Sequence, residues 1–186
     1  MKRLTCASRC RAGMTLTETL MAVLMITLLT SVIAAGIMAA FRVNIQSTFA
    51  STSQVVSDTI DLALSDVLRY AADVETDGSG NVTAYTNSGY GIAGGKLCVG
   101  TGDDRGLIYL KYDGADSDGN VLLLSDLSYS GLLVVPGDYD PDTGSDSGAF
   151  DLRYADGVFS GSYRLYDPVN GLLSDLFTFS FRSVNG

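Results

Sequence analysis

The stretch that decides the fold lies near the amino terminus, where residues 11–36 read RAGMTLTETLMAVLMITLLTSVIAAG. Residues 19–41 form a run of 23 positions without a charged side chain. A helix of this length extends for roughly 35 Å, whereas the hydrocarbon core of a bilayer is about 30 Å thick. The run is therefore predicted to be a helix that can cross a membrane.

The charges on either side of this run indicate its orientation. Four of the first eleven residues are cations, at Lys2, Arg3, Arg9 and Arg11, with no acid among these eleven, and Glu18 is the one acid before the run. Only Arg42 follows closely. Because the cytoplasmic end of a membrane helix carries the excess of Lys and Arg, we expect a cytoplasmic amino terminus and an extracytoplasmic carboxyl-terminal part. A secretory signal peptide is an alternative, with cleavage after Gly36 and a secreted domain that starts at Ile37.

Glu18 places a carboxylate at the edge of the apolar run. An acid at this level must reach water or find a partner, and such groups commonly have a function. One alternative is local: Thr15-Leu16-Thr17-Glu18 fits a capping box, in which Thr15 and Glu18 bond to each other's backbone N–H groups. The other is that a cation on a neighbouring chain neutralises the acid.

The basic leader, Gly13, the five-residue spacing from Met14 to Glu18 and the apolar run together resemble the class III signal of type IV pilins and type II secretion pseudopilins. The resemblance implies that a prepilin peptidase cuts after Gly13 and that Met14 becomes the methylated amino terminus. Glu18 is then the fifth residue of the mature chain. Met14 departs from the phenylalanine that is usual at this position. Cleavage would create an amine near the level of Glu18, and the amine of one subunit would pair with the acid of another.

The resemblance also implies a function and its partners. We expect a structural subunit of a type IV pilus or pseudopilus, held in the membrane by a single span before assembly. Prepilin peptidase, other subunits and the membrane are the expected partners, and the product is a cell-surface or periplasmic filament. The alternative is an uncleaved, single-pass protein that displays an extracellular binding module.

The helical pattern continues beyond the apolar run. Apolar residues recur at helical spacing at Ile45, Phe49, Val56, Ile60, Leu64, Val67 or Leu68, and Ala71. No proline precedes residue 136. We therefore divide the chain into a leader (1–13), a transmembrane and assembly helix (14–41), an amphipathic continuation of that helix (42–72) and a head (73–186).

The composition changes near residue 73, since 19 of the 21 glycines and all three prolines lie beyond it. Strands are predicted at residues 81–86, 96–99, 107–112, 121–124, 132–135, 150–154, 158–166 and 176–182. Turns are predicted at the Asp-Gly pairs 77–78, 113–114, 118–119 and 156–157 and at Asn170-Gly171. The expected fold is α+β, with a long amino-terminal helix packed by its second half on an antiparallel β-sheet head.

The charged and titratable residues exclude several functions. The chain has 12 Lys and Arg against 21 Asp and Glu, and no His. Without His there is no Ser-His-Asp triad and no His-based zinc site. The acidic balance, −9 for the whole chain, argues against nucleic acid as a partner. No pair of carboxylates is singled out for catalysis, so we expect a protein that is not an enzyme.

The chain has three cysteines, at positions 6, 10 and 98, and two clusters of acidic residues in the head. Removal of the leader would discard Cys6 and Cys10, which leaves Cys98 without an intramolecular disulfide partner in the mature chain. We expect Cys98 to be a buried strand thiol, and a reactive or intersubunit thiol is the alternative. Calcium is the only cofactor to consider. Asp138, Asp140 and Asp142, with Asp146 nearby, begin like an EF-hand loop, but Thr143 replaces its glycine and Ala149 its glutamate. A second cluster comprises Asp113, Asp116, Asp118 and Asn120. Solvated acidic turns are the favoured interpretation of both clusters.

Overall fold

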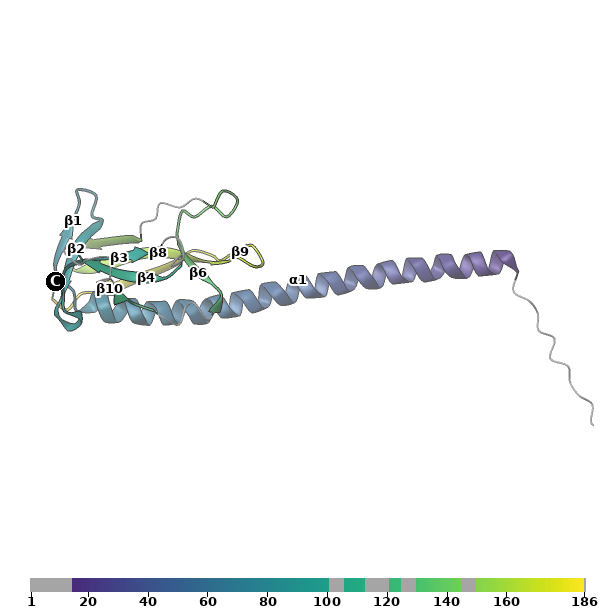
Figure 1. The fold of residues 1–186 in the computed structure, drawn as a ribbon, viewed down its shortest axis with the longest axis horizontal. Coiled ribbons are helices and arrows are strands. Elements are labelled where there is room, and N and C mark those ends of the chain that lie inside the picture. Colours follow the sequence, from purple (N-terminus) through teal and green to yellow (C-terminus); the bar gives the residue numbers. More distant parts are fainter. Residues whose placement is uncertain (1–14, 101–105, 113–120, 125–129, 145–149, 186) are drawn as a thin grey trace, which may run out of the picture. The chain divides into compact units, whose positions relative to one another are not determined.

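The computed structural model describes residues 15–100, 106–112, 121–124, 130–144 and 150–185. One long helix, α1 (Leu16–Arg69), precedes a set of antiparallel strands, which confirms the predicted α+β fold (Figure 1). The elements that follow α1 are β1 (Ala72–Thr76), β2 (Val82–Asn87), the 3-10 helix η1 (Ser88–Tyr90), β3 (Ile92–Val99), β4 (Ile108–Tyr112), β5 (Val121–Leu122), β6 (Leu133–Pro136), β7 (Asp151–Ala155), β8 (Val158–Asp167), β9 (Leu172–Leu173) and β10 (Phe177–Arg182).

The chain divides into two compact units, Met1–Ile45 and Gln46–Gly186. Helix α1 contributes to both of them. We call residues 16–45 the apolar stretch and residues 46–69 the packed stretch. The helix has no proline to remove a backbone donor, so its hydrogen bonding continues from one stretch into the other.

The packed stretch buries one face against the strands of the second unit. Its buried apolar residues are Val56, Ile60, Leu64, Val67 and Leu68. Their spacing of three or four residues places them on one side of a helix, which confirms the predicted stripe over this range. Toward the amino terminus this face leaves the core, because Phe49 is half-buried against it and Ile45 is exposed.

The strands form two antiparallel sheets, whereas the sequence patterns suggested a single one. The first sheet has the order β1-β2-β3-β4-β5. The second is built around β8, whose ten residues pair with β10 and β9 on one edge and with β7 and β6 on the other. Local patterns locate strands, but the division into sheets depends on pairings between distant segments.

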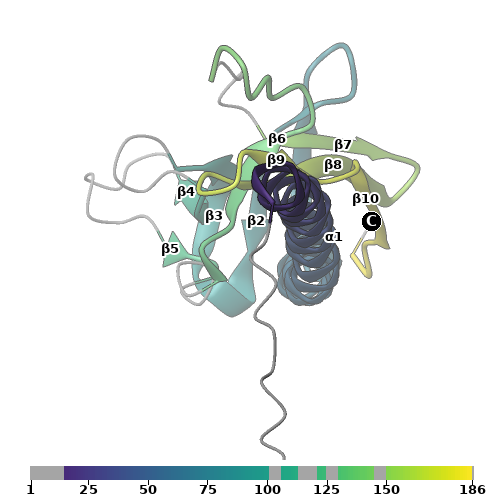
Figure 2. The same ribbon diagram turned by 90° about the vertical axis from the view of Figure 1, so that its right-hand side faces the viewer.

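Both sheets and the packed stretch share one hydrophobic core. The first sheet contributes Leu97, Val99, Ile108 and Leu110, and the second contributes Leu152, Phe159, Tyr163, Leu165 and Phe179. The alternation in β10 gives Phe177, Phe179 and Phe181 to the core and leaves Thr178 and Ser180 exposed, as its period of two predicts. Figure 2 shows the strands gathered beside the packed stretch of α1.

The tight turn between β7 and β8 follows from its Asp-Gly pair. Asp156 and Gly157 have φ angles of 51° and 78°. Two consecutive positive φ angles give the turn the twist that a two-residue hairpin needs, and glycine adopts such an angle without strain. This predicted turn is confirmed, whereas the Asp-Gly pairs at 113–114 and 118–119 lie outside the described residues.

Candidate functional site

The first candidate site is the surface of the apolar stretch. No residue between Thr15 and Thr48 is buried, and large side chains such as Leu20, Met25 and Val32 are at least 60% exposed. Among the described parts of the chain, α1 is the one helix long and apolar enough to cross a membrane. Because contiguous exposed apolar surface of this kind is unfavourable in water, the stretch requires lipid or other apolar helices around it.

The hydroxyl groups of the apolar stretch are satisfied within the helix. The side chains of Thr19, Thr27, Thr30 and Ser31 each donate a hydrogen bond of 2.7–3.0 Å to the carbonyl three residues earlier. A polar group in lipid or between packed helices must find a hydrogen-bond partner other than water. These bonds provide that partner within the helix. The threonines and serines therefore do not conflict with an apolar environment.

Glu18 lies in the first turn of α1 and is exposed. Its backbone N–H donates to the carbonyl of Thr15 at 3.0 Å, and the Thr15 hydroxyl contacts the Thr17 hydroxyl at 3.1 Å. The reciprocal bonds of a capping box are not formed, and within the described residues the Glu18 carboxylate has no hydrogen-bond or ion-pair partner. The predicted cleavage residues, Gly13 and Met14, lie outside the described part of the chain.

A buried polar contact fastens the packed stretch to the centre of the second sheet. The Tyr163 hydroxyl on β8 lies 3.0 Å from the Ser57 hydroxyl and donates to the Asp61 carboxylate at 3.1 Å. Burial raises the pKa of Asp61, and the charge of Asp58 raises it further, against the lowering effect of the Tyr163 hydrogen bond. Burial also raises the pKa of Tyr163. Ser57 and Tyr163 are 106 residues apart, so no local pattern indicated this contact.

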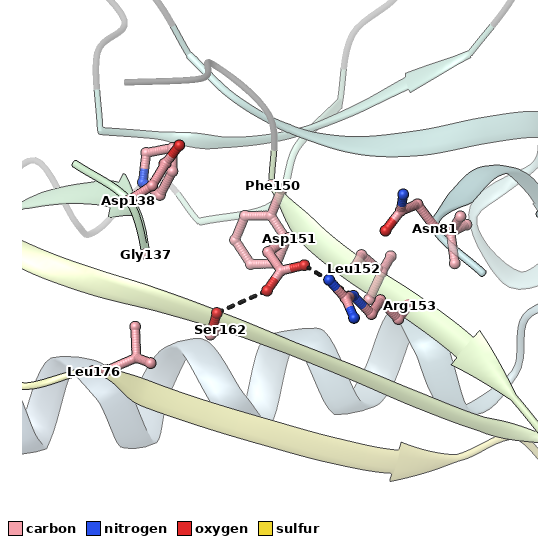
Figure 3. A pocket seen from close by; sticks show the side chains of 11 residues that line it. Asn81, Gly137, Asp138, Phe150, Asp151, Leu152, Arg153, Ser162 and Leu176 are labelled. Atoms are coloured by element: carbon pink, nitrogen blue, oxygen red, sulfur yellow. Dashed lines mark hydrogen bonds and ion pairs between the residues drawn. The ribbon is translucent and has the colours of Figure 1, made fainter. Parts of the chain in front are cut away.

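The second candidate site is a pocket of about 550 Å³ in the head (Figure 3). Strands β6 and β7 pair with successive parts of the same edge of β8, and the pocket lies where one follows the other. At this point Pro136 of β6 pairs with Tyr163, and Asp151 of β7 pairs with the adjacent Ser162. Its apolar lining comprises Val82, Pro136, Phe150, Leu152 and Leu176, and its polar lining comprises Asn81, Asp138, Asp151, Arg153 and Ser162.

Asp151 of this pocket is held by two neighbouring side chains. The Ser162 hydroxyl donates to Asp151 Oδ2 at 2.8 Å, and Arg153 Nε lies 3.6 Å from Asp151 Oδ1 (Figure 3). The guanidinium keeps further donors for a ligand, because the Arg153 side chain is 65% exposed. Donors, acceptors and apolar walls in one hollow suit a small polar ligand. No local sequence pattern indicated this site, because its residues come from five separate segments.

The predicted calcium ligands do not form a cluster among the described residues. No three Asp, Glu or Cys side chains gather there in a way that could hold a metal ion, and this includes Asp138, Asp140 and Asp142. Asp140 instead accepts hydrogen bonds from the Asp142 backbone N–H at 3.0 Å and the Thr143 hydroxyl at 2.9 Å. These two bonds lower the pKa of Asp140. Asp146 and the cluster Asp113, Asp116, Asp118 and Asn120 lie outside the described residues.

Cys98 lies in β3 as predicted, but its side chain is only half-buried. Burial raises the pKa of this thiol, and the nearby charges of Lys96 and Lys111 lower it by less. The thiol is therefore predominantly protonated at neutral pH, which disfavours nucleophilic chemistry. Cys6 and Cys10 fall outside the described part of the chain.

Comparisons with protein-family models, curated proteins and solved structures find no match for this chain.

Proposed function

We propose that this chain is a structural subunit of a type IV pilus or a related pseudopilus, processed by a prepilin peptidase and built into a helical filament through α1. The observation that carries the proposal is the apolar stretch, whose large side chains are exposed while the packed stretch of the same helix is covered by its own head. The leader, Gly13, Met14 and Glu18 supply the pattern that points to processing.

The proposed mechanism begins with cleavage after Gly13 on the cytoplasmic side of the membrane. The new amine at Met14 is then methylated and lies near the level of Glu18. In the assembled filament this amine pairs with the Glu18 carboxylate of an adjoining subunit. The pair is strong because little water reaches it among apolar helices, and it selects a register in which amine and acid meet.

Mass spectrometry of the native amino terminus tests this proposal directly. A chain that starts at methylated Met14 is expected. A chain that still carries residues 1–13 would contradict the proposal and support the membrane-anchored alternative, while a chain that starts at Ile37 would support the secreted one.

A substitution separates processing from assembly. Glu18→Gln keeps the size of the side chain and removes its charge. We expect normal cleavage after Gly13 and strongly reduced incorporation into filaments, measured by immunoblotting of sheared filament and membrane fractions. Normal incorporation of the Gln variant would refute the pairing role of Glu18.

The pocket in the head favours the binding module as a second candidate function. An uncleaved anchor would display Asp151 and Arg153 to extracellular ligands without any filament. The mass measurement decides between the two, because only the filament subunit requires removal of residues 1–13.

A further inference from the structure

Lys96 and Lys111 form an unusual pair on the first sheet. They are the only lysines beyond residue 13, and they lie directly opposite each other on β3 and β4. Both side chains are exposed. Like charges at directly opposed positions of a sheet are destabilising, because their Cβ atoms are only about 5 Å apart. Among the described residues neither ammonium group has an ion-pair partner.

The unit that carries this lysine pair is strongly acidic. Residues 46–186 carry 7 Lys and Arg against 20 Asp and Glu, a net charge of −13. Two such units repel each other unless cations lie at their contact. Two residues further along, the next row on the same face of the sheet holds Cys98, Tyr109 and Leu122 in register, and Leu122 is 37% exposed. A basic pair beside an apolar row is suited to bind an acidic protein segment.

We propose that Lys96 and Lys111 form a docking face for the acidic turn at residues 138–142 of a second copy of this chain. This inference rests on the proposed function and names the head contact within the filament. The turn is held by the two hydrogen bonds to the Asp140 carboxylate, and the lowered pKa of Asp140 keeps it charged. Asp142 is exposed beside it.

The placement of the two surfaces determines the kind of assembly. The lysines lie on β3 and β4 of the first sheet, whereas the turn follows β6 of the second (Figure 2). The contact joins two different patches, so it is heterologous and can continue from copy to copy. Heterologous contacts produce rings or open helical filaments, unlike the self-complementary contact of a two-fold dimer.

The test uses the full-length chain in its own host and compares filament-bound fractions. Lys96→Glu with Lys111→Glu should leave cleavage after Gly13 intact and lower the filament-bound fraction at least about fivefold. Adding Asp142→Lys to this double variant should recover at least about half of the loss, because opposite charges face each other again. Arg69→Glu with Arg182→Glu is the matched control, since it changes the net charge equally at two exposed cations that are not cross-strand neighbours.

Three results would overturn the docking proposal. Filaments of the lysine variant could form at the wild-type level, the arginine control could lose filaments equally, or Asp142→Lys could restore nothing. The last result would point to a different acidic partner. Failure of the proposed function is recognised separately, because the wild-type chain would then keep residues 1–13 and form no filament.

Discussion

Leu28 in the apolar stretch and Leu64 in the packed stretch are the same residue type in the same helix, yet Leu28 is 57% exposed and Leu64 is fully buried. Both stretches are regular helix, so backbone geometry does not cause the difference. What differs is the surface available to cover each side chain. The head covers the packed stretch, and the apolar stretch requires a partner from outside the described chain.

Shortening one leucine in each stretch should give the largest difference between them. Leu64→Ala leaves a cavity in the shared core and should reduce the free energy of unfolding of the head by about 2–5 kcal/mol. Leu28→Ala should change it by less than about 0.5 kcal/mol, because the head does not cover this side chain. Urea unfolding of the full chain in detergent micelles, followed by near-UV circular dichroism of its tyrosines, measures both values. Equal effects would contradict the division of α1 into two stretches.

Two glycines, Gly161 in the head and Gly36 in the apolar stretch, differ in the same way. A Cβ at Gly161 of β8 would collide with the Asp151 carbonyl and lie 2.5 Å from Phe179 Cζ, whereas a Cβ at Gly36 would meet nothing within 4 Å. Gly161→Ala should therefore destabilise the head by about 1–3 kcal/mol or more. Gly36→Ala should leave head stability unchanged and make the apolar stretch a better helix. Thermal unfolding of both variants checks the difference, and an unaffected Gly161 variant would contradict the close packing of β7 and β10 on β8.

The hydroxyl of Tyr163 tests the polar contact that holds the packed stretch. Tyr163→Phe removes the bonds to Ser57 and Asp61 and should reduce the free energy of unfolding by about 1 kcal/mol. The matched control is Tyr70→Phe, because Tyr70 is 53% exposed. If the two variants unfold at the same urea concentration, the contact contributes nothing to the attachment of α1.

The smallest expected effect is a pH dependence from Asp61. Its pKa in the folded head is raised above 3.8, so the folded state holds the proton more tightly than the unfolded state. The stabilisation is present below the unfolded pKa and is lost as the pH rises through the folded pKa. Asp61→Asn removes this titration, so its stability relative to wild type should improve as the pH rises above the unfolded pKa of 3.8. If the difference in free energy of unfolding between the Asn variant and the wild type stays constant as the pH rises, Asp61 does not titrate as inferred.

The parts of the fold that could be predicted are those with a local signal. The spacing of Val56, Ile60 and Leu64 identified the buried helix face, and the alternation in β10 identified a half-buried strand. The eight predicted strands all occur in the structure, but β1 and β9 were missed. β9 has only two residues, and β1, with the sequence ADVET, has little apolar content, so neither has a distinct pattern.

The features that could not be predicted depend on contacts between distant segments. The second sheet forms because β8 pairs with segments on both of its edges, and the pocket exists because β6 and β7 share one of these edges. The pairing of Lys96 with Lys111 depends on the register between β3 and β4. A shift of one residue in this register would abolish the pairing. The role of Glu18 stays a prediction, because its expected partner belongs to another chain.

Site-specific photocrosslinking in cells tests whether the apolar stretch of one copy contacts another copy. A photoreactive phenylalanine analogue at Val32, which is 70% exposed in the apolar stretch, should crosslink one copy of the chain to another and give a ladder of covalent oligomers. The same analogue at Leu62 serves as the comparison, because Leu62 is 74% exposed in the packed stretch and so is about as accessible as Val32. A ladder from Val32 that disappears in the Glu18→Gln variant is the predicted result. Crosslinks from Val32 to lipid alone, with no second copy, would contradict assembly through α1.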